Sequence, residues 1–160
     1  CLTGDGSLMM NLQELSTVVA HKLPVKIVLL DNAGYSMVRQ TEEQWLGGLN
    51  VGTSVASGLA FPNWECVAKA FGLPARCVRT QRDVAEGLDW LFVTKGPAFL
   101  HVVIPSEARV TPQVAFGYAI EDSEPHLPRE EFLAQLIVPP LPRSLEPTDP
   151  TRTLPLRCNT

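Results

Sequence analysis

Two short polar motifs offer oxygen atoms that could hold a cation, residues 4–7 (Gly-Asp-Gly-Ser) and residues 31–32 (Asp-Asn). The first motif follows what reads as the end of a strand at residues 1–3, and the second follows the aliphatic run 25–30. A right-handed crossover returns a parallel strand beside its predecessor, so both motifs are expected at the same carboxyl edge of a sheet, where open α/β folds bind ligands. The sequence therefore predicts that Asp5 and Asn32 lie close together.

These groups suit a magnesium ion that also holds a diphosphate. Asp5 offers a carboxylate oxygen, Asn32 a carboxamide oxygen, and the following turn a backbone carbonyl, predicted to be that of Gly34. Mg²⁺ takes six oxygen ligands at ~2.1 Å, so three protein oxygens leave positions for phosphate oxygens and a water. The small Gly6 allows a phosphate to approach the backbone, and Ser7 adds an N–H and a hydroxyl as donors.

Two other interpretations of the motifs stay open. In the first, residues 4–7 are only a tight strand-to-helix turn, with Asp5 as an acid at the start of a helix. In the second, Gly4-Asp5-Gly6 begins a dinucleotide-binding glycine loop, and Asp31 accepts a ribose hydroxyl. Against the second, Met9 stands where the third glycine belongs, and an acid in the loop would face the pyrophosphate without a metal.

The elements around the motifs alternate between strand and helix patterns. Apolar residues recur with helical spacing from Leu12 to Val19, and further helices are predicted at 35–43, 64–71 and 84–92. Strands are predicted at 25–30, 76–79 and 98–104, and 47–62 is a loop long enough to be functional. This alternation predicts an α/β fold with a mainly parallel sheet and helices on both faces.

The chain divides into three parts by composition. Residues 1–104 are expected to form the ligand-binding domain, with its first strand incomplete. Residues 105–138 form a C-terminal extension with one short helix predicted at 129–137, and 139–160 form a proline-rich tail that is expected to be disordered. Because the first residue is Cys1, the chain is expected to be part of a longer polypeptide.

Composition excludes several classes of function. The net charge is −4 and Lys and Arg form no run, so no nucleic-acid partner is expected. No apolar run reaches ~18 residues, which argues against a membrane span. The four cysteines form no CxxC pair, so their spacing argues against a zinc site or a disulfide scaffold and favours reduced thiols in a cytoplasmic protein. His101, inside a predicted strand, is interpreted as a hydrogen-bonded sheet residue.

Residues 4–40 resemble a known family. The segment GDGSLMMNLQELSTVVAHKLPVKIVLLDNAGYSMVRQ is similar to the thiamine-diphosphate (ThDP) binding signature of acetolactate synthases, pyruvate-type decarboxylases and related 2-oxoacid enzymes. The acetolactate synthase branch is the most similar, through the NLQEL and LPVKIV elements, and the resemblance extends over residues 1–104. The LPREEF segment, within 122–140, resembles the tail of acetolactate-synthase-like proteins.

The resemblance implies a ThDP-binding fold and a role for each motif residue. Asp5 and Asn32 would bind Mg²⁺ through their side chains and Gly34 through its carbonyl oxygen. The residues expected to contact the cofactor are Gly4, Asp5, Gly6, Ser7, Asn32, Gly34, Tyr35, Ser36 and Met37, of which the last three would line the reactive ring and the substrate pocket.

The resemblance also implies what this chain lacks. In the family a glutamate on a separate domain activates the cofactor, so no catalytic residue is assigned here and the chain alone is expected to be inactive. The full-length enzyme would be a homodimer or homotetramer that acts on a small 2-oxoacid as a carboligase or a decarboxylase. Two positions depart from the family pattern. Asp31 replaces an asparagine that is not a metal ligand, and Thr41 replaces a tryptophan, which favours an acceptor other than that of acetolactate synthases.

Overall fold

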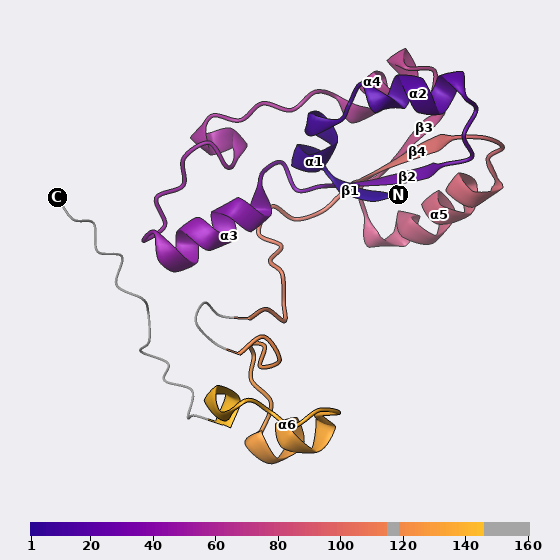
Figure 1. Cartoon of the computed structure of the whole chain (residues 1–160). Coiled ribbons are helices and arrows are strands. Elements are labelled where there is room, and N and C mark those ends of the chain that lie inside the picture. The colour runs from indigo at the N-terminus through magenta and orange to yellow at the C-terminus, as the bar shows by residue number, and fades with distance from the viewer. Residues whose placement is uncertain (115–118, 146–160) are drawn as a thin grey trace.

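The computed structural model describes residues 1–114 and 119–145 (Figure 1). Of the tail that is predicted to be disordered, residues 146–160 lie outside the described residues, and residues 142–145 form a short 3-10 helix, η3 (Pro142–Leu145). The described helices include none that is long and apolar enough to cross a membrane.

A four-stranded parallel sheet forms the centre of the fold. Its strands are β1 (Leu2–Gly4), β2 (Lys26–Asp31), β3 (Ala75–Val78) and β4 (Ala98–Val103), in the spatial order β1-β2-β4-β3. Each neighbouring pair is parallel, and Gly4 lies opposite Leu30, which brings the carboxyl ends of β1 and β2 to one edge. The predicted parallel sheet is confirmed.

Helices cover both faces of the sheet, as predicted (Figure 1). One face carries α1 (Asp5–Met10), α2 (Glu14–Ala20) and α4 (Trp64–Ala70), and the other carries α5 (Val84–Val93). Successive strand residues point to opposite faces, so each face has its own apolar core. The first core contains Leu8, Leu15, Ile27, Leu29, Trp64, Ala68, Leu73 and Phe99, and the second contains Val78, Leu91, Ala98 and Leu100.

The segment after β1 carries the helix predicted from Leu12 to Val19 as α2, which begins at Glu14. It contains two short helices, because the chain turns at residues 11–13, where the Asn11 N–H donates to the Leu8 carbonyl at 3.1 Å. The turn lets Leu8 of α1 and Leu15 of α2 both reach the core, with Leu12 packed against it. The spacing from Leu12 to Val19 therefore predicted α2 correctly, except for its first two residues.

The remaining elements lie close to their predicted positions. Helix α3 (Ser36–Trp45) follows the turn after β2, and a 3-10 helix, η1 (Val55–Ser57), interrupts the predicted loop 47–62. A second 3-10 helix, η2 (Gln81–Asp83), precedes α5, and α6 (Arg129–Gln135) is the predicted helix of the C-terminal extension. Figure 1 shows α3 and α6 away from the sheet. Helix α3 lies on the side of the sheet at which β1 and β2 end.

Candidate functional site

Asp5 ties the end of β1 to the turn after β2. It is the first residue of α1 and only 3% exposed. Its Oδ1 accepts a hydrogen bond from the Gly6 N–H at 2.7 Å, and its Oδ2 accepts one from the Gly34 N–H at 3.0 Å. Each carboxylate oxygen has two lone pairs, so the carboxylate can accept more than these two hydrogen bonds.

The turn after β2 presents the side chain of Asn32 to the same edge. Ala33 has a φ of 54°, a left-handed conformation that is unfavourable for a residue with a Cβ. The Asp31 Oδ1 stabilises the turn by accepting a hydrogen bond from the Ala33 N–H at 2.9 Å. Asn32 Oδ1 is buried and has no hydrogen-bond partner among the described residues. A buried acceptor without a partner costs ~1–3 kcal/mol, so this oxygen is suited to a donor or a cation.

Asp5, Asn32 and Gly34 line one cavity of about 430 Å³. The sequence-predicted site residues all lie in its wall, together with Met10 and Val38. They are Gly4, Asp5, Gly6, Ser7, Asn32, Gly34, Tyr35, Ser36 and Met37. The topology therefore brings residues 4–7, the end of β2 and the start of α3 to one concave surface.

The Tyr35 ring lies directly over Gly6. A Cβ on Gly6 would lie 2.4 Å from two carbon atoms of the ring, so no larger residue fits there without movement of Tyr35. The ring also makes an edge contact with Phe61, with centroids 6.2 Å apart. The Gly6 N–H donates to Asp5. The absence of a Cβ at this position leaves room for the Tyr35 ring as well as for any bound phosphate.

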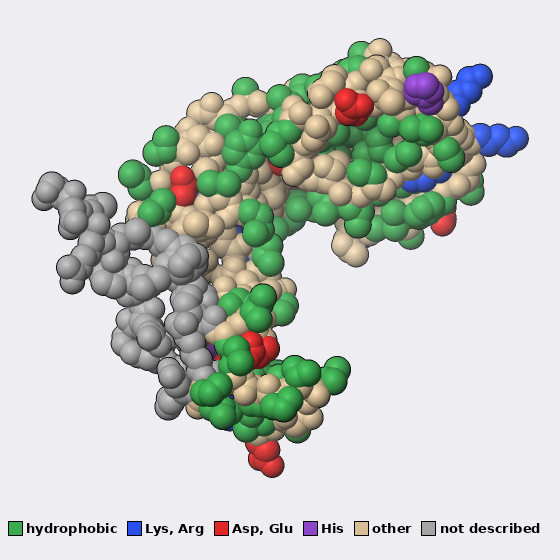
Figure 2. Space-filling view, viewed as in Figure 1, with side chains coloured by type: hydrophobic (Ala, Val, Ile, Leu, Met, Phe, Trp, Pro, Cys, Tyr) green, Lys and Arg blue, Asp and Glu red, His purple; other side chains and the backbone are tan. Residues whose placement is uncertain are grey.

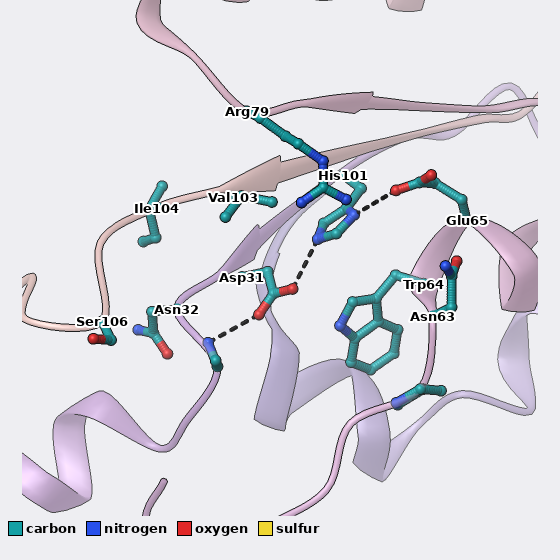
Figure 3. Close-up of a pocket in the computed structure, with 12 residues that line it drawn as sticks. Asp31, Asn32, Asn63, Trp64, Glu65, Arg79, His101, Val103, Ile104 and Ser106 are labelled. Carbon is teal, nitrogen blue, oxygen red and sulfur yellow. Dashed lines mark hydrogen bonds and ion pairs between the residues drawn. The ribbon is translucent and has the colours of Figure 1, made fainter. Parts of the chain in front are cut away.

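Behind Asn32, His101 joins three elements of the fold (Figure 3). Its Nε2 lies 2.8 Å from Asp31 Oδ2, and its Nδ1 lies 2.9 Å from Glu65 Oε1. His101 is on β4, Asp31 ends β2 and Glu65 is on α4. The imidazole is 5% exposed, so these two carboxylates fix its orientation and, through Asp31, support the turn that carries Asn32.

The two carboxyl groups at this edge influence one another. Burial raises the pKa of Asp5, and the neighbouring Asp31 adds to the rise, while the N–H groups of Gly34 and Gly6 oppose it. Burial also acts to raise the pKa of Asp31, but the Ala33 N–H, His101 and Asp5 together outweigh it, so the pKa of Asp31 is lowered. The edge thus concentrates negative charge that a bound cation would balance.

Comparison with known families shows which family the chain belongs to. Residues 1–102 match the family described as "Thiamine pyrophosphate enzyme, C-terminal TPP binding domain". The chain belongs to this family. The matched residues include the whole sheet except the last residue of β4, and they include every residue in the wall of the 430 Å³ cavity.

Curated relatives of this thiamine pyrophosphate enzyme domain are acetolactate synthases. The chain is 34% identical to the chloroplastic acetolactate synthase of Arabidopsis thaliana over 125 residues, which is 76% of this chain and 19% of the relative. It is 38% identical to the large subunit of acetolactate synthase isozyme 2 of Escherichia coli (strain K12) over 117 residues, or 73% of this chain and 21% of the relative. The chain thus spans about a fifth of the length of these relatives.

A solved structure supports the same fold assignment. The thiamine diphosphate-dependent 4-hydroxybenzoylformate decarboxylase of Rhodococcus jostii RHA1 superposes with a TM-score of 0.58 and 25% sequence identity. The match covers 67% of this chain and 20% of that chain. The acetolactate-synthase-like resemblance and the ThDP-binding fold predicted from the sequence are therefore confirmed.

Sequence reasoning missed the contacts behind Asn32. His101 was expected to be a hydrogen-bonded sheet residue, but nothing in the sequence pattern linked it to Asp31 and Glu65. Glu65 and Trp64 line a second cavity of about 280 Å³, which also contains Asp31 and His101 in its wall (Figure 3). The one available signal was Asp31 in place of the family asparagine, because an acid at that position calls for a partner.

Proposed function

We propose that this chain supplies the magnesium–diphosphate half of a ThDP site, with Asp5 and Asn32 as side-chain ligands and Gly34 as a carbonyl ligand. The observation that carries the proposal is the buried Asn32 Oδ1, which lacks a partner among the described residues and shares a cavity with Asp5. Carboxylate, amide and carbonyl oxygens are the ligands that Mg²⁺ prefers. The donor set therefore fits the ion that the family implies.

The chain's own groups position the cofactor in this proposal. ThDP supplies an electron sink for the cleavage of a bond next to a carbonyl group. Asp5 and the Gly34 N–H hold the two strand ends together, and Asp31 holds the Ala33 turn, so the metal ligands are fixed before the cofactor binds. Because the Gly6 N–H is used by Asp5, we assign the phosphate contacts to Ser7, which lines the same cavity.

The reaction proposed for the full-length protein is the processing of a 2-oxoacid, by carboligation or by decarboxylation. The curated relatives are named acetolactate synthases, and the solved structure is named a decarboxylase. Thr41 lies on α3 four residues after Met37, whose carbonyl accepts the Thr41 hydroxyl at 3.1 Å. A threonine is much smaller than the tryptophan of the family pattern, so we propose an acceptor other than that of acetolactate synthases.

We further propose that the chain is inactive until another domain and a second copy complete the site. The family's activating glutamate is not assigned to any residue of this chain. Helix α3 and the loop after it expose apolar side chains (Figure 2). They include Met37, which lines the cavity, at 62% exposed, Leu46 at 50% and Leu49 at 71%. Exposed apolar side chains on one segment are typical of interaction sites, and a homodimer or homotetramer would cover them. A cytoplasmic location stays a prediction, since the plant relatives are chloroplastic by name.

The proposal is tested by calorimetric titration of the full-length protein with ThDP, with and without Mg²⁺. Asp5→Asn and Asn32→Ala should each weaken Mg²⁺-dependent ThDP binding by at least ~10-fold, since even supporting residues of metal sites have effects of that size. Asp89→Asn, on the exposed surface of α5, is the matched control and should leave binding unchanged. Metal-independent binding that both variants retain would show that the motif is only a structural turn.

A further inference from the structure

Three potential metal ligands from three different elements meet on the α4 face of the sheet. Cys77 on β3 and His101 on β4 are register partners, so their side chains emerge side by side on the same face. Glu65 of α4 packs over them, and its Oε1 lies 2.9 Å from His101 Nδ1. One ligand atom from each of the three residues lies within 4.8 Å of the other two.

We propose that Glu65, Cys77 and His101 form a second metal site, selective for a borderline cation such as Zn²⁺. Tetrahedral zinc with bonds of ~2.0–2.3 Å holds its ligand atoms about 3.5 Å apart. The widest separation, at most 4.8 Å, therefore needs to close by little more than ~1 Å, while the 2.9 Å Glu65–His101 contact opens to admit the ion. A thiolate and an imidazole select Zn²⁺ over Mg²⁺, which prefers oxygen ligands only. The proposal is independent of the magnesium–diphosphate assignment.

The surroundings of His101 match those of a metal ligand. Its Nε2 bonds to Asp31 Oδ2 at 2.8 Å, which directs Nδ1 toward Glu65 and Cys77. Metal-bound histidines typically hold their second nitrogen against a carboxylate in this way. The imidazole is 5% exposed, so its orientation is fixed before a metal binds.

The second cavity gives a metal access to solvent. Glu65 and His101 line this space of about 280 Å³ (Figure 3), and Trp64 lies in its wall. Trp64 is 1% exposed, and its Nε1 has no hydrogen-bond partner among the described residues. Three protein ligands leave the fourth zinc position open, and the indole N–H offers a donor to a water or anion in the same cavity.

Carboxylates lie on both sides of His101, with Asp31 Oδ2 at 2.8 Å and Glu65 Oε1 at 2.9 Å. The competing interpretation is that His101, held between these two carboxylates, is only a structural ion pair, and the experiment must separate the two.

The test uses the full-length protein, reduced, freed of metal with a chelator and then saturated with Mg²⁺ and ThDP, so that the oxygen-ligand site is occupied. Zn²⁺ is titrated against a chromophoric chelator, and Co²⁺ is used as a spectroscopic probe for thiolate ligation. The parent and the Cys66→Ser control, which removes an exposed thiol next to Glu65, should bind one Zn²⁺ per chain and show the thiolate-to-cobalt absorption band. Cys77→Ser should weaken Zn²⁺ binding at least ~10-fold and lose the band.

A second readout leaves the proposed ligands unchanged. In the Cys66→Ser protein, one equivalent of Zn²⁺ should protect Cys77 from alkylation, whether or not Cys77→Ser folds. Equal Zn²⁺ affinity in the parent and Cys77→Ser, or no protection of Cys77, would overturn the proposal in favour of the structural ion pair. Asp5→Asn should keep the zinc site, so failure of the magnesium–diphosphate assignment would be seen separately.

Discussion

The Asp5 carboxylate accepts a hydrogen bond from the Gly34 N–H at 3.0 Å and thereby joins the ends of two neighbouring strands. Asp5 follows β1, and Gly34 lies in the turn after β2. The bond holds Asn32 in a turn whose left-handed Ala33 is unfavourable by itself. The proposed cation ligands are thus arranged by the fold before any ligand is present.

Gly34→Ala tests how tightly this turn is packed. A Cβ at position 34 would lie 2.5 Å from the backbone oxygen of Thr53, which cannot move without the loop. We expect the free energy of unfolding to fall by ~1–3 kcal/mol, the usual cost of overpacking. Urea denaturation of Gly4→Ala is the matched control, because a Cβ there meets only the Leu30 oxygen at 3.9 Å. Equal stabilities of the two variants would contradict the packing of this turn.

His101→Leu should destabilise the protein much more than its control. The substitution leaves Asp31 and Glu65 without the group that both contact, at side-chain exposures of 16% and 25%. We expect a loss of about 2–3 kcal/mol, below the cost of breaking a fully buried pair because solvent reaches both carboxylates. His21→Leu, at an exposed position, should change the midpoint of urea unfolding little. A loss of the same size in both variants would refute the supporting role of His101.

Which contacts of this site can be predicted depends on how far apart the two residues are in the sequence. Asp5 and Asn32 were expected to meet because β1 and β2 are consecutive, and consecutive parallel strands usually pair. His101 could not be linked to Asp31, because β4 is inserted between β2 and β3, and neither spacing nor periodicity fixes that order. The same insertion places Cys77 beside His101, although the cysteine spacing argued against a metal site. The turn at residues 11–13 was missed because Leu12 continues the apolar spacing of the helix. Leu12 lies in the turn and packs against the first core from there.

Cys77 should react slowly with alkylating reagents. Burial, with Glu65 as the second cause, raises its pKa to about 11, so little thiolate exists at pH 8, and the thiolate is the nucleophile. In chelator-treated protein we expect Cys77 to be labelled at least ~10-fold more slowly than the exposed Cys66. The Cys77 rate should rise about tenfold per pH unit up to pH ~10. Peptide mapping after iodoacetamide treatment measures both rates, and a Cys77 rate that is equal to that of Cys66 would contradict the burial.

Asp122 makes the C-terminal extension sensitive to acid. Two bonds from Arg129, at 2.7 and 2.8 Å, hold the pKa of Asp122 below its ordinary value of 3.8. A lowered folded-state pKa means that the carboxylate's contribution to stability is complete above about pH 4. That contribution is lost as the pH falls through the lower folded-state value.

Asp122→Asn should therefore reduce amide-exchange protection of residues 119–135 at neutral pH. We expect about 1 kcal/mol, a low figure for charged hydrogen bonds because the Arg129 side chain is 41% exposed. The difference from the parent should disappear at the acid end of the transition. A difference that stays constant with pH would mean that the ion pair is not its source.

The most direct measurement is anomalous diffraction from crystals of the full-length protein grown with ThDP and with Mn²⁺ in place of Mg²⁺. The proposed site predicts one strong manganese peak within bonding distance of an Asp5 carboxylate oxygen and of Asn32 Oδ1. A bound cofactor with no peak there, or with its metal on other residues, would contradict the assignment.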